Sequence, residues 1–582
     1  VQTCALPILL IKNSKIFIFY FKSLIFIIII KKYFERIKGR MFKDYVLSLK
    51  KEFAGYNGQK LVMDILAGLT VAAVALPLAL AFGVSSGADA GAGLITAIIA
   101  GLLIGGLSGA SYQISGPTGA MSAILIGLST TYGLQGVFVA SFISGVMLLI
   151  VSLFKFGKIV SFIPASVITG FTSGIAIIIA TGQIDNFFGV TSKGSNPIEK
   201  ILSYRMLGFN VNLEALFFGI LVIAIIILWP KKWGNIFPAS LAGIIIALII
   251  NLVFKFNVAE VGSIPSTLLP KARLSLNSLN LTAITNLIIP AFSIAMLGMI
   301  ESLLCGASAG KMKNEKLNAD QELFAQGIGN MVIPFFGGVP ATAAIARTSV
   351  AIKAGGQTRL VSIFHAAALL ISMFVLGPFM SRIPLSALAG VLIMTAWKMN
   401  EWHEIKQFFS KRIKTSMTQF LVTMLATVVF DLTVAIVIGV FISMILFVIN
   451  NSDLDIETSD IEPQRLDKEL NYDHQRTKVI YMAGPLFFGN QEQIITKVNE
   501  ILNECNNIIF SMRGVPSIDD SGIREFIDVV ELCRQNNINV LFAGVQKNVM
   551  KQFKRHHFVE LAQPNNFCWD VIKALDKIEQ KG

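Results

Sequence analysis

The sequence predicts an α-helical membrane protein that carries a small α/β domain on its C-terminal side. Apolar residues make up 54% of the 582 residues, and many apolar runs approach the roughly 20 residues that a helix needs to cross a bilayer. After residue 450 the composition turns polar, and strand and helix patterns alternate. Residues 1–450 carry a net charge of +18 and residues 451–582 one of −5. The basic residues therefore flank membrane segments and indicate topology, not a nucleic-acid partner.

Apolar runs predict about fourteen membrane segments within residues 62–450. Two segments, 117–128 and 341–352, are short and interrupted by Gly and Pro. Lys and Arg concentrate in loops that follow even-numbered segments, with a partial exception after the fifth and seventh. We expect the protein to lie in a bacterial inner membrane, where lipid surrounds its helices. The charge bias predicts that both ends of the chain lie in the cytoplasm.

An internal repeat indicates that the two halves share one fold. Ser161–Gly170 and Ser381–Gly390 are identical at five of ten positions, at an offset of 220 residues. Pro117 and Pro340, in the two short segments, lie 223 residues apart. About seven segments per repeat is an odd number, so the halves should lie inverted in the bilayer. Short interrupted segments at matching positions of inverted halves point to a transporter's site near the membrane midplane.

The two short segments predict a site for a small anion. A helix N-terminus presents unbonded backbone N–H groups and a partial positive charge, and Pro340 fits the first position of a helix. We therefore predict a helix that starts at Pro340 and a second half-helix that faces it. The expected substrate-binding residues are Ser115, Pro117, Thr118, Gly119, Ala120, Ala341, Thr342 and Ala343.

Arg347 and Glu301 are ionisable residues inside predicted membrane segments, where charge is costly and usually functional. We expect Arg347 to add positive charge behind the anion. Glu301 can carry a proton or stay charged beside a cation. A salt bridge between the two that breaks on protonation would couple a proton to the anion. The structural alternatives are a static ion pair between them, or an Arg347 that is bound by another carboxylate or by backbone carbonyls.

Residues 1–40 differ in composition from the rest of the chain. Val1–Ile8 matches the translation of a sequencing-library adapter, and the following residues resemble translated AT-rich DNA. We expect residues 1–40 to be an artefact and Met41 to be the natural start, although an extra span or signal anchor is the alternative. Residues 41–61 then form a cytoplasmic lead-in.

The motifs of the membrane part resemble those of the SulP family of anion transporters. They are Asp64–Ala72, Ala75–Phe82, Gly116–Gly119, Glu301–Leu304, Pro340–Thr348 and the region of Ala396 and Trp397, and the similarity runs from about Met41 to the C-terminus. The resemblance implies two inverted repeats of seven segments, a core domain that holds the site, a gate domain, and elevator-like transport. Its substrates would be sulfate, bicarbonate, chloride or small dicarboxylates.

Departures from the family pattern bear on the coupling ion. Phe82, which the resemblance places in the pocket, stands where many members have Tyr. Glu301 and Cys305 stand where sodium-dependent bicarbonate members have Asp and Thr. We therefore favour proton-coupled symport over sodium coupling.

Several other functions stay open as alternatives. Within transport they are sodium-coupled bicarbonate uptake and an uncoupled anion uniporter. A nucleobase–proton symporter has the same architecture but would need a carboxylate on the tenth segment, where this chain has Arg347. A membrane-tethered sensor is a further possibility. The five cysteines show no metal-binding spacing, and with no catalytic cluster or phosphate-binding loop we predict no metal, cofactor or enzyme activity.

The C-terminal part is expected to consist of an acidic linker, 451–474, and an α/β domain, 475–582. Within the domain, Val515–Gly522 resembles the signature loop of STAS domains. The site residues that we select from this loop are Asp519, Asp520, Ser521 and Gly522. Of these, Asp520 and Ser521 should cap the following helix. In stand-alone relatives the serine that matches Ser521 is phosphorylated, but here we expect a plain helix cap. We also expect the protein to form a homodimer.

Overall fold

The computed structural model describes residues 43–158, 163–193, 197–230, 237–430, 432–452, 454–461, 476–490 and 492–580. The expected artefact, residues 1–40, and the expected start at Met41 lie outside the described residues. The chain divides into two compact units, Val1–Val440 and Phe441–Gly582, which are treated in turn.

The first unit is built from helices. The first half contains α2 (Gly58–Ser85), α3 (Ala90–Leu107), α4 (Gly119–Leu153), α5 (Ala165–Gly182), α6 (Ile184–Phe188), α7 (Pro197–Leu207), α8 (Leu213–Leu228) and α10 (Ala239–Phe254). The second half contains α11 (Leu281–Lys313), α12 (Ala319–Val332), α13 (Ile345–Lys353), α14 (Leu360–Met380), α15 (Leu385–Met399), α16 (Trp402–Ser410), α17 (Lys414–Val429) and α18 (Leu432–Asn451), within which the unit ends. Short 3-10 turns lie at Leu276–Ser278 and Ile333–Phe336.

These helices account for the predicted membrane segments. Among the described residues, seven helices are long and apolar enough to cross a membrane, and α8, α10 and α15 are shorter apolar helices. Helix α4 contains two of the predicted segments, because Gly133 adopts a positive φ of 67° inside it. Pro164 and Pro384, from the matching motifs, precede α5 and α15 as N-cap residues, so the repeat starts equivalent helices.

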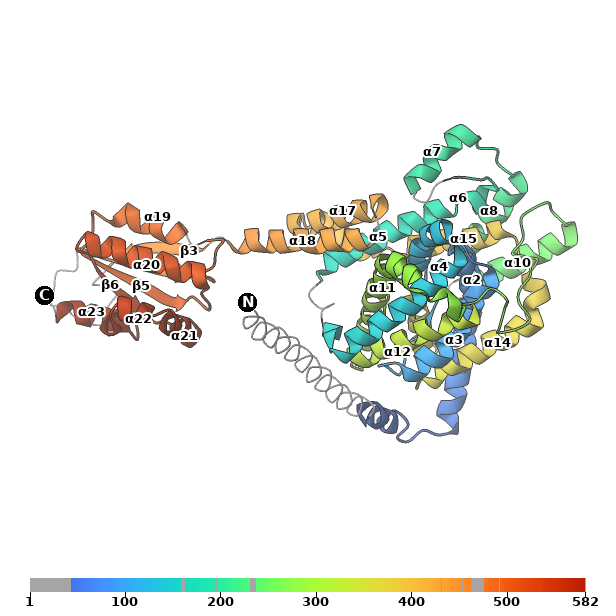
Figure 1. The fold of residues 1–582 in the computed structure, drawn as a ribbon, viewed down its shortest axis with the longest axis horizontal. Helices are drawn as coiled ribbons and strands as arrows, with labels where there is room; N and C mark the ends of the chain where they lie inside the picture. The colour runs from blue at the N-terminus through green and yellow to red at the C-terminus, as the bar shows by residue number, and fades with distance from the viewer. Residues whose placement is uncertain are drawn as a thin grey trace, which may run out of the picture. The chain divides into compact units, whose positions relative to one another are not determined.

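The helices pack in two groups, which correspond to the expected core and gate (Figure 1). In the first group, the core, α4 packs against α11 and α12, and α14 packs against α2 and α3. In the second group, the gate, α5 packs against α15 and α17, and α8 packs against α10 and α15. Helices α2 and α3 approach so closely that a Cβ on Gly93 would lie 2.0 Å from the Ala79 carbonyl oxygen.

The second short segment differs from the prediction. No helix starts at Pro340: Thr342 and Ala343 form a strand, β2, that pairs antiparallel with β1 at Ser115–Gly116. Helix α13 begins only at Ile345. The physical reason is that buried backbone N–H and C=O groups inside a membrane need partners, and pairing between the two halves supplies them.

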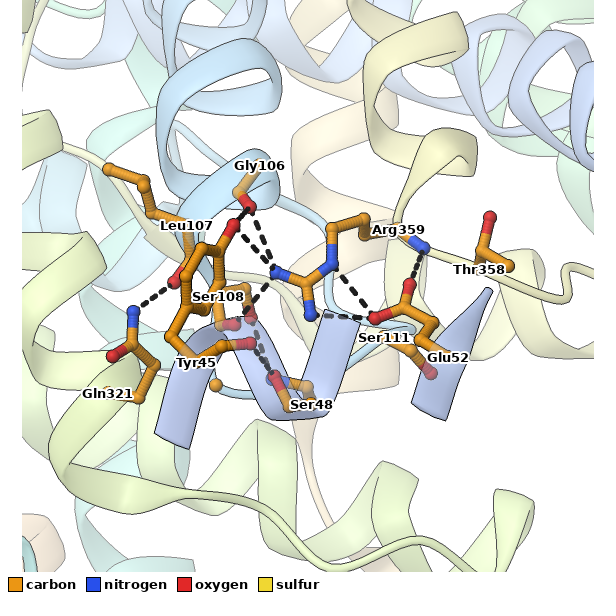
Figure 2. Close-up of polar contacts among 12 residues, drawn as sticks. Tyr45, Ser48, Glu52, Gly106, Leu107, Ser108, Ser111, Gln321, Thr358 and Arg359 are labelled. Carbon is orange, nitrogen blue, oxygen red and sulfur yellow. Dashed lines mark hydrogen bonds and ion pairs between the residues drawn. The ribbon is translucent and has the colours of Figure 1, made fainter. Parts of the chain in front are cut away.

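A buried ion pair fastens the N-terminal helical residues 43–52 to the helix bundle (Figure 2). Glu52 and Arg359 lie 2.7 Å apart, with side chains 8% and 6% exposed. The Arg359 guanidinium also donates to the carbonyl oxygens of Gly106 at 2.9 Å and Ser108 at 3.3 Å. Tyr45 donates to the same Gly106 oxygen and places its ring under the guanidinium, 5.2 Å away. Arg359 therefore joins the N-terminal residues to the end of α3.

The second unit contains a five-stranded sheet in the order β3 (Asp455–Asp460), β4 (Thr477–Ala483), β5 (Asn507–Gly514), β6 (Asn539–Ala543) and β7 (Phe567–Cys568). Strand β3 is antiparallel to β4 and the other pairs are parallel. Apolar residues of α19 (Glu492–Ile501), α20 (Asp520–Gln535), α21 (Lys547–Arg555) and α22 (Phe558–Leu561) pack with one face of the sheet, and those of α23 (Val571–Glu579) with the other. Strand β3 lies inside the stretch that we expected to be a linker, because its backbone completes the edge of β4.

The signature loop caps α20 with a different residue from the expected ones. The helix begins at Asp520, and Asp519 is the N-cap: its Oδ1 accepts from the Gly522 N–H at 3.0 Å. Its Oδ2 also accepts from the Phe488 N–H at 3.1 Å. Asp520 instead pairs with Arg524 at 2.9 Å. Ser521 lies within the first helical turn, so the expectation that it caps the helix is wrong.

We predict that Glu52→Ala strongly destabilises the protein. The change leaves the Arg359 guanidinium buried without its carboxylate, and removing one partner of a buried pair costs about 3–5 kcal/mol. Glu500→Ala is the control, since it breaks an ion pair of the same 2.7 Å length that is half-exposed and is worth less than about 1 kcal/mol. Thermal unfolding of the full chain in detergent should show a large loss for the first variant only. Equal melting temperatures would contradict the assigned role of Glu52.

We also predict that Asp519→Ala destabilises the second unit and that Asp520→Ala does not. Loss of a helix N-cap costs about 1 kcal/mol, whereas the exposed pair of Asp520 contributes little. Limited proteolysis of the full chain, followed at sites within the second unit, measures the difference. Faster cleavage of the Asp520 variant would assign the cap to the wrong residue.

Candidate functional site

The two short segments meet inside the first unit. Across the strand pair, Ser115 faces Ala343 and Gly116 faces Thr342. Helix α4 begins three residues after β1 and α13 two residues after β2. All the predicted substrate-binding residues from these segments are buried: Ser115, Pro117, Thr118, Gly119, Ala120, Ala341, Thr342, Ala343 and Arg347. The structure therefore brings together the residues that the sequence singles out.

The start of α4 combines free backbone donors with a close apolar wall. The N–H groups of Gly119 and Ala120 have no partner within the helix, as in the first turn of any helix. Thr118 caps the helix and accepts from the Met121 N–H at 3.4 Å. A Cβ on Gly119 would lie 2.5 Å from Ile179 Cδ1 and 3.1 Å from Phe82 Cε1. Phe82, the remaining predicted pocket residue, thus lies against the helix start, where a side chain at position 119 would require Ile179 to shift.

Arg347 lies in the first turn of α13 and crosses to the other half of the protein. Its Nη2 donates to the Pro117 carbonyl oxygen at 2.6 Å. A Cβ on Gly116 would lie 2.5 Å from its Nη1, so the guanidinium rests on β1. The side chain is 1% exposed, and within the described part of the chain Nη1 has no hydrogen-bond partner. Arg347 therefore keeps an unused donor at the strand pair.

Glu301 contacts one threonine from each half. Its Oε2 accepts from Thr342 Oγ1 at 2.6 Å and from Thr118 Oγ1 at 2.9 Å. The ion pairs of the described residues do not include one between Glu301 and Arg347. The expected salt bridge between these two groups is therefore wrong for this conformation. The carboxylate instead accepts hydrogen bonds from a threonine hydroxyl group of each short segment.

The sequence did not point to the residues that hold the strand pair in place. Thr96 bonds both the N–H and the carbonyl of Val339, at 2.8 and 2.9 Å. Asn330 bonds both groups of Ala341, and Ser302 Oγ accepts from the Ala343 N–H at 3.2 Å. One signal was visible, since Glu322, Gln326 and Asn330 repeat every four residues and the other residues from 323 to 332 are apolar or glycine.

The arrangement suits a small anion. Two helix N-termini contribute unbonded N–H groups and the positive ends of their dipoles, and Arg347 adds a full positive charge. Thr118 and Thr342 add hydroxyl groups. Among the described residues, clusters of three or more His, Cys, Asp or Glu that could hold a metal ion are absent.

Relatives of the chain are transporters. The sulfate permease family profile matches residues 61–426, and the STAS domain profile matches residues 470–568. YvdB of Bacillus subtilis, whose name assigns it to sulfate transport, is 33% identical over 511 residues, which cover 85% of this chain and 93% of that protein. The bicarbonate transporter BicA of Picosynechococcus is 27% identical over 535 residues, with 88% and 94% covered.

Two solved structures share the fold. SLC26A9 has a TM-score of 0.77 at 18% identity, over 90% of this chain and 91% of that chain. The transmembrane domain of a cyanobacterial BicA has a TM-score of 0.60 at 29% identity, over 67% and 98%. The predicted fold class, a helical membrane protein with a small α/β domain, is thereby confirmed. Since one family profile spans more than half of its residues, the chain belongs to the sulfate permease family of anion transporters and carries a STAS domain.

Proposed function

We propose that the protein is a secondary active transporter that carries a small anion of the sulfate, bicarbonate or dicarboxylate class together with a proton. The observation that carries this proposal is the position of Glu301, whose carboxylate is bonded at once to Thr118 and Thr342 beside the anion donors. A proton on Glu301 would change its bonds to both halves. The protonation state and the shape of the site are therefore coupled.

In this proposal each site residue has a role. The N–H groups at the starts of α4 and α13 bind the anion, and the free Nη1 of Arg347 gives it a charged contact. Phe82 limits the size of the site on the side of α2. Glu301 carries the coupled proton. The core carries this site past the gate in an elevator-like movement. No step calls for covalent chemistry, so we do not propose an enzyme.

Proton coupling is favoured over sodium coupling by the neighbours of Glu301. One turn along α11, Cys305 Sγ lies 3.4 Å from Thr348 Oγ1, where it can donate a hydrogen bond. Sodium is a hard cation that prefers oxygen ligands, and a thiol is a poor substitute. We further propose a homodimer in the bacterial inner membrane with both termini in the cytoplasm. This orientation rests on the basic loops.

We predict that Glu301→Gln abolishes proton-driven accumulation. Glutamine can still accept hydrogen bonds from both threonines but cannot exchange a proton, so anion exchange should persist while uptake ignores the pH gradient. The measurement is uptake of radiolabelled sulfate and bicarbonate into proteoliposomes with an inward proton gradient. Glu401→Gln is the matched control, because Glu401 likewise accepts from a threonine, Thr169, at a site in the gate. Uptake driven by sodium and insensitive to pH would refute the proposal.

We predict that Arg347→Met weakens anion binding by roughly ten- to hundredfold, the effect expected for one lost hydrogen bond to a charged group. Arg382→Met is the control, since that guanidinium pairs with Glu260 at 3.2 Å and is 62% exposed. Binding to the purified protein is measured by calorimetry with a panel of sulfate, bicarbonate and small dicarboxylates, which also identifies the substrate. Equal affinity in wild type and Arg347→Met would remove Arg347 from the site.

A further inference from the structure

We propose that Glu322, Gln326 and Asn330 are positioning residues that hold both strands of the anion site in register. The inference rests on the proposed function, because it concerns the same site. The three residues repeat every four positions along α12 and so lie on one face of that helix. Their side chains are 0%, 0% and 1% exposed. We refer to them as the α12 polar face.

Asn330 binds the lead-in to β2 at two points. Its Oδ1 accepts from the Ala341 N–H at 2.7 Å, and its Nδ2 donates to the Ala341 carbonyl at 2.9 Å. This is the pattern by which a neighbouring strand would bind the same residue. The side-chain amide thus replaces a strand that the two-residue β2 lacks, and it fixes the backbone immediately before Thr342.

Gln326 binds the other strand, one turn earlier on the same face. Its Nε2 donates to Ser115 Oγ at 3.0 Å and to Glu322 Oε1 at 2.9 Å. Ser115 is the first residue of β1 and belongs to the first half of the protein, whereas α12 and β2 belong to the second. One helix face therefore binds both halves of the site.

Glu322 anchors this face to the end of α3. Its Oε2 accepts from Ser108 Oγ at 2.6 Å and from the Gly109 N–H at 3.1 Å. The carbonyl of the same Ser108 accepts from Arg359, which Figure 2 shows beside Glu52 and Tyr45. A continuous set of hydrogen bonds thus runs from the N-terminal residues through Ser108 and α12 to β1.

The role follows from how the site binds its anion. Apart from Arg347, the proposed donors are backbone N–H groups, and their directions are set by the strands that precede α4 and α13. None of the three α12 side chains needs to touch the anion. A change in Asn330 or Gln326 would rotate these donors and weaken binding, while the charge of the site would stay the same.

The test compares Asn330→Ala with Asn251→Ala in the full-length protein. Asn251 is also a buried asparagine, 3% exposed, and its Nδ2 bonds Glu260 and the Arg382 carbonyl in the gate. For sulfate and bicarbonate we expect Asn330→Ala to raise KM roughly tenfold, as the loss of a backbone-positioning hydrogen bond implies, with maximal velocity changed less. Gln326→Met, which removes the bond to Ser115 without changing the charge, should also raise KM, and Asn251→Ala should leave KM unchanged.

A second measurement does not depend on transport. Hydrogen exchange of peptides that cover residues 114–120 and 339–344 should become faster in Asn330→Ala and in Gln326→Met, and not in Asn251→Ala. If Asn330→Ala does not fold, Gln326→Met carries the test. Unchanged KM together with unchanged exchange in folded variants would overturn the inference. If the wild type binds none of the anions, the proposed function fails, and the exchange data alone then decide whether α12 holds the strands.

Discussion

The first unit depends on the pairing of four residues, Ser115 and Gly116 with Ala343 and Thr342. Backbone that is neither helical nor part of a larger sheet is expensive inside a membrane, because water is absent and each unpaired N–H or C=O costs several kcal/mol. The two inverted halves solve this by pairing with each other. What remains unpaired are the first N–H groups of α4 and α13, and these are the groups that an anion can use. The same constraint thus shapes the backbone and leaves the N–H groups that we propose bind the anion.

The charged groups follow a similar logic. Arg347 belongs to the second half and bonds the Pro117 carbonyl of the first half. Glu301 bonds threonines of both halves and leaves Arg347 without a carboxylate partner in the described ion pairs. A buried cation with a free donor is unfavourable unless an anion joins it. In the proposed mechanism this charge is available to the substrate through Nη1, while Nη2 serves the fold by its bond to the Pro117 carbonyl.

Local patterns in the sequence were enough to find the halves, the two short segments and the charged residues. The start of α13 was missed because Pro340 is locally compatible with a helix. The residues after it form β2 instead, and the partner strand β1 lies more than 200 positions away in sequence. Non-local pairing of this kind leaves no periodic signal in a two-residue strand. In the same way, β3 forms only because β4 offers an open edge. Asp519, Asp520 and Ser521 are all good helix caps, so composition alone could not choose among them.

The contact between α5 and the start of α4 bears on the proposed movement of the site. Ile179 of α5 and Phe82 of α2 both lie against Gly119 at the start of α4. An apolar side chain has no directional bonds to break, so α5 can slide past α4 at a smaller cost than a polar contact would impose. The polar contacts of Asn330, Gln326 and Ser302 lie within the core. The gate also makes a polar contact with the core, from Gln183 Nε2 to Ser85 Oγ at 3.1 Å, but the contact at the start of α4 is apolar. This apolar contact, beside a core that keeps its own hydrogen bonds, fits our proposal that the site travels as a unit.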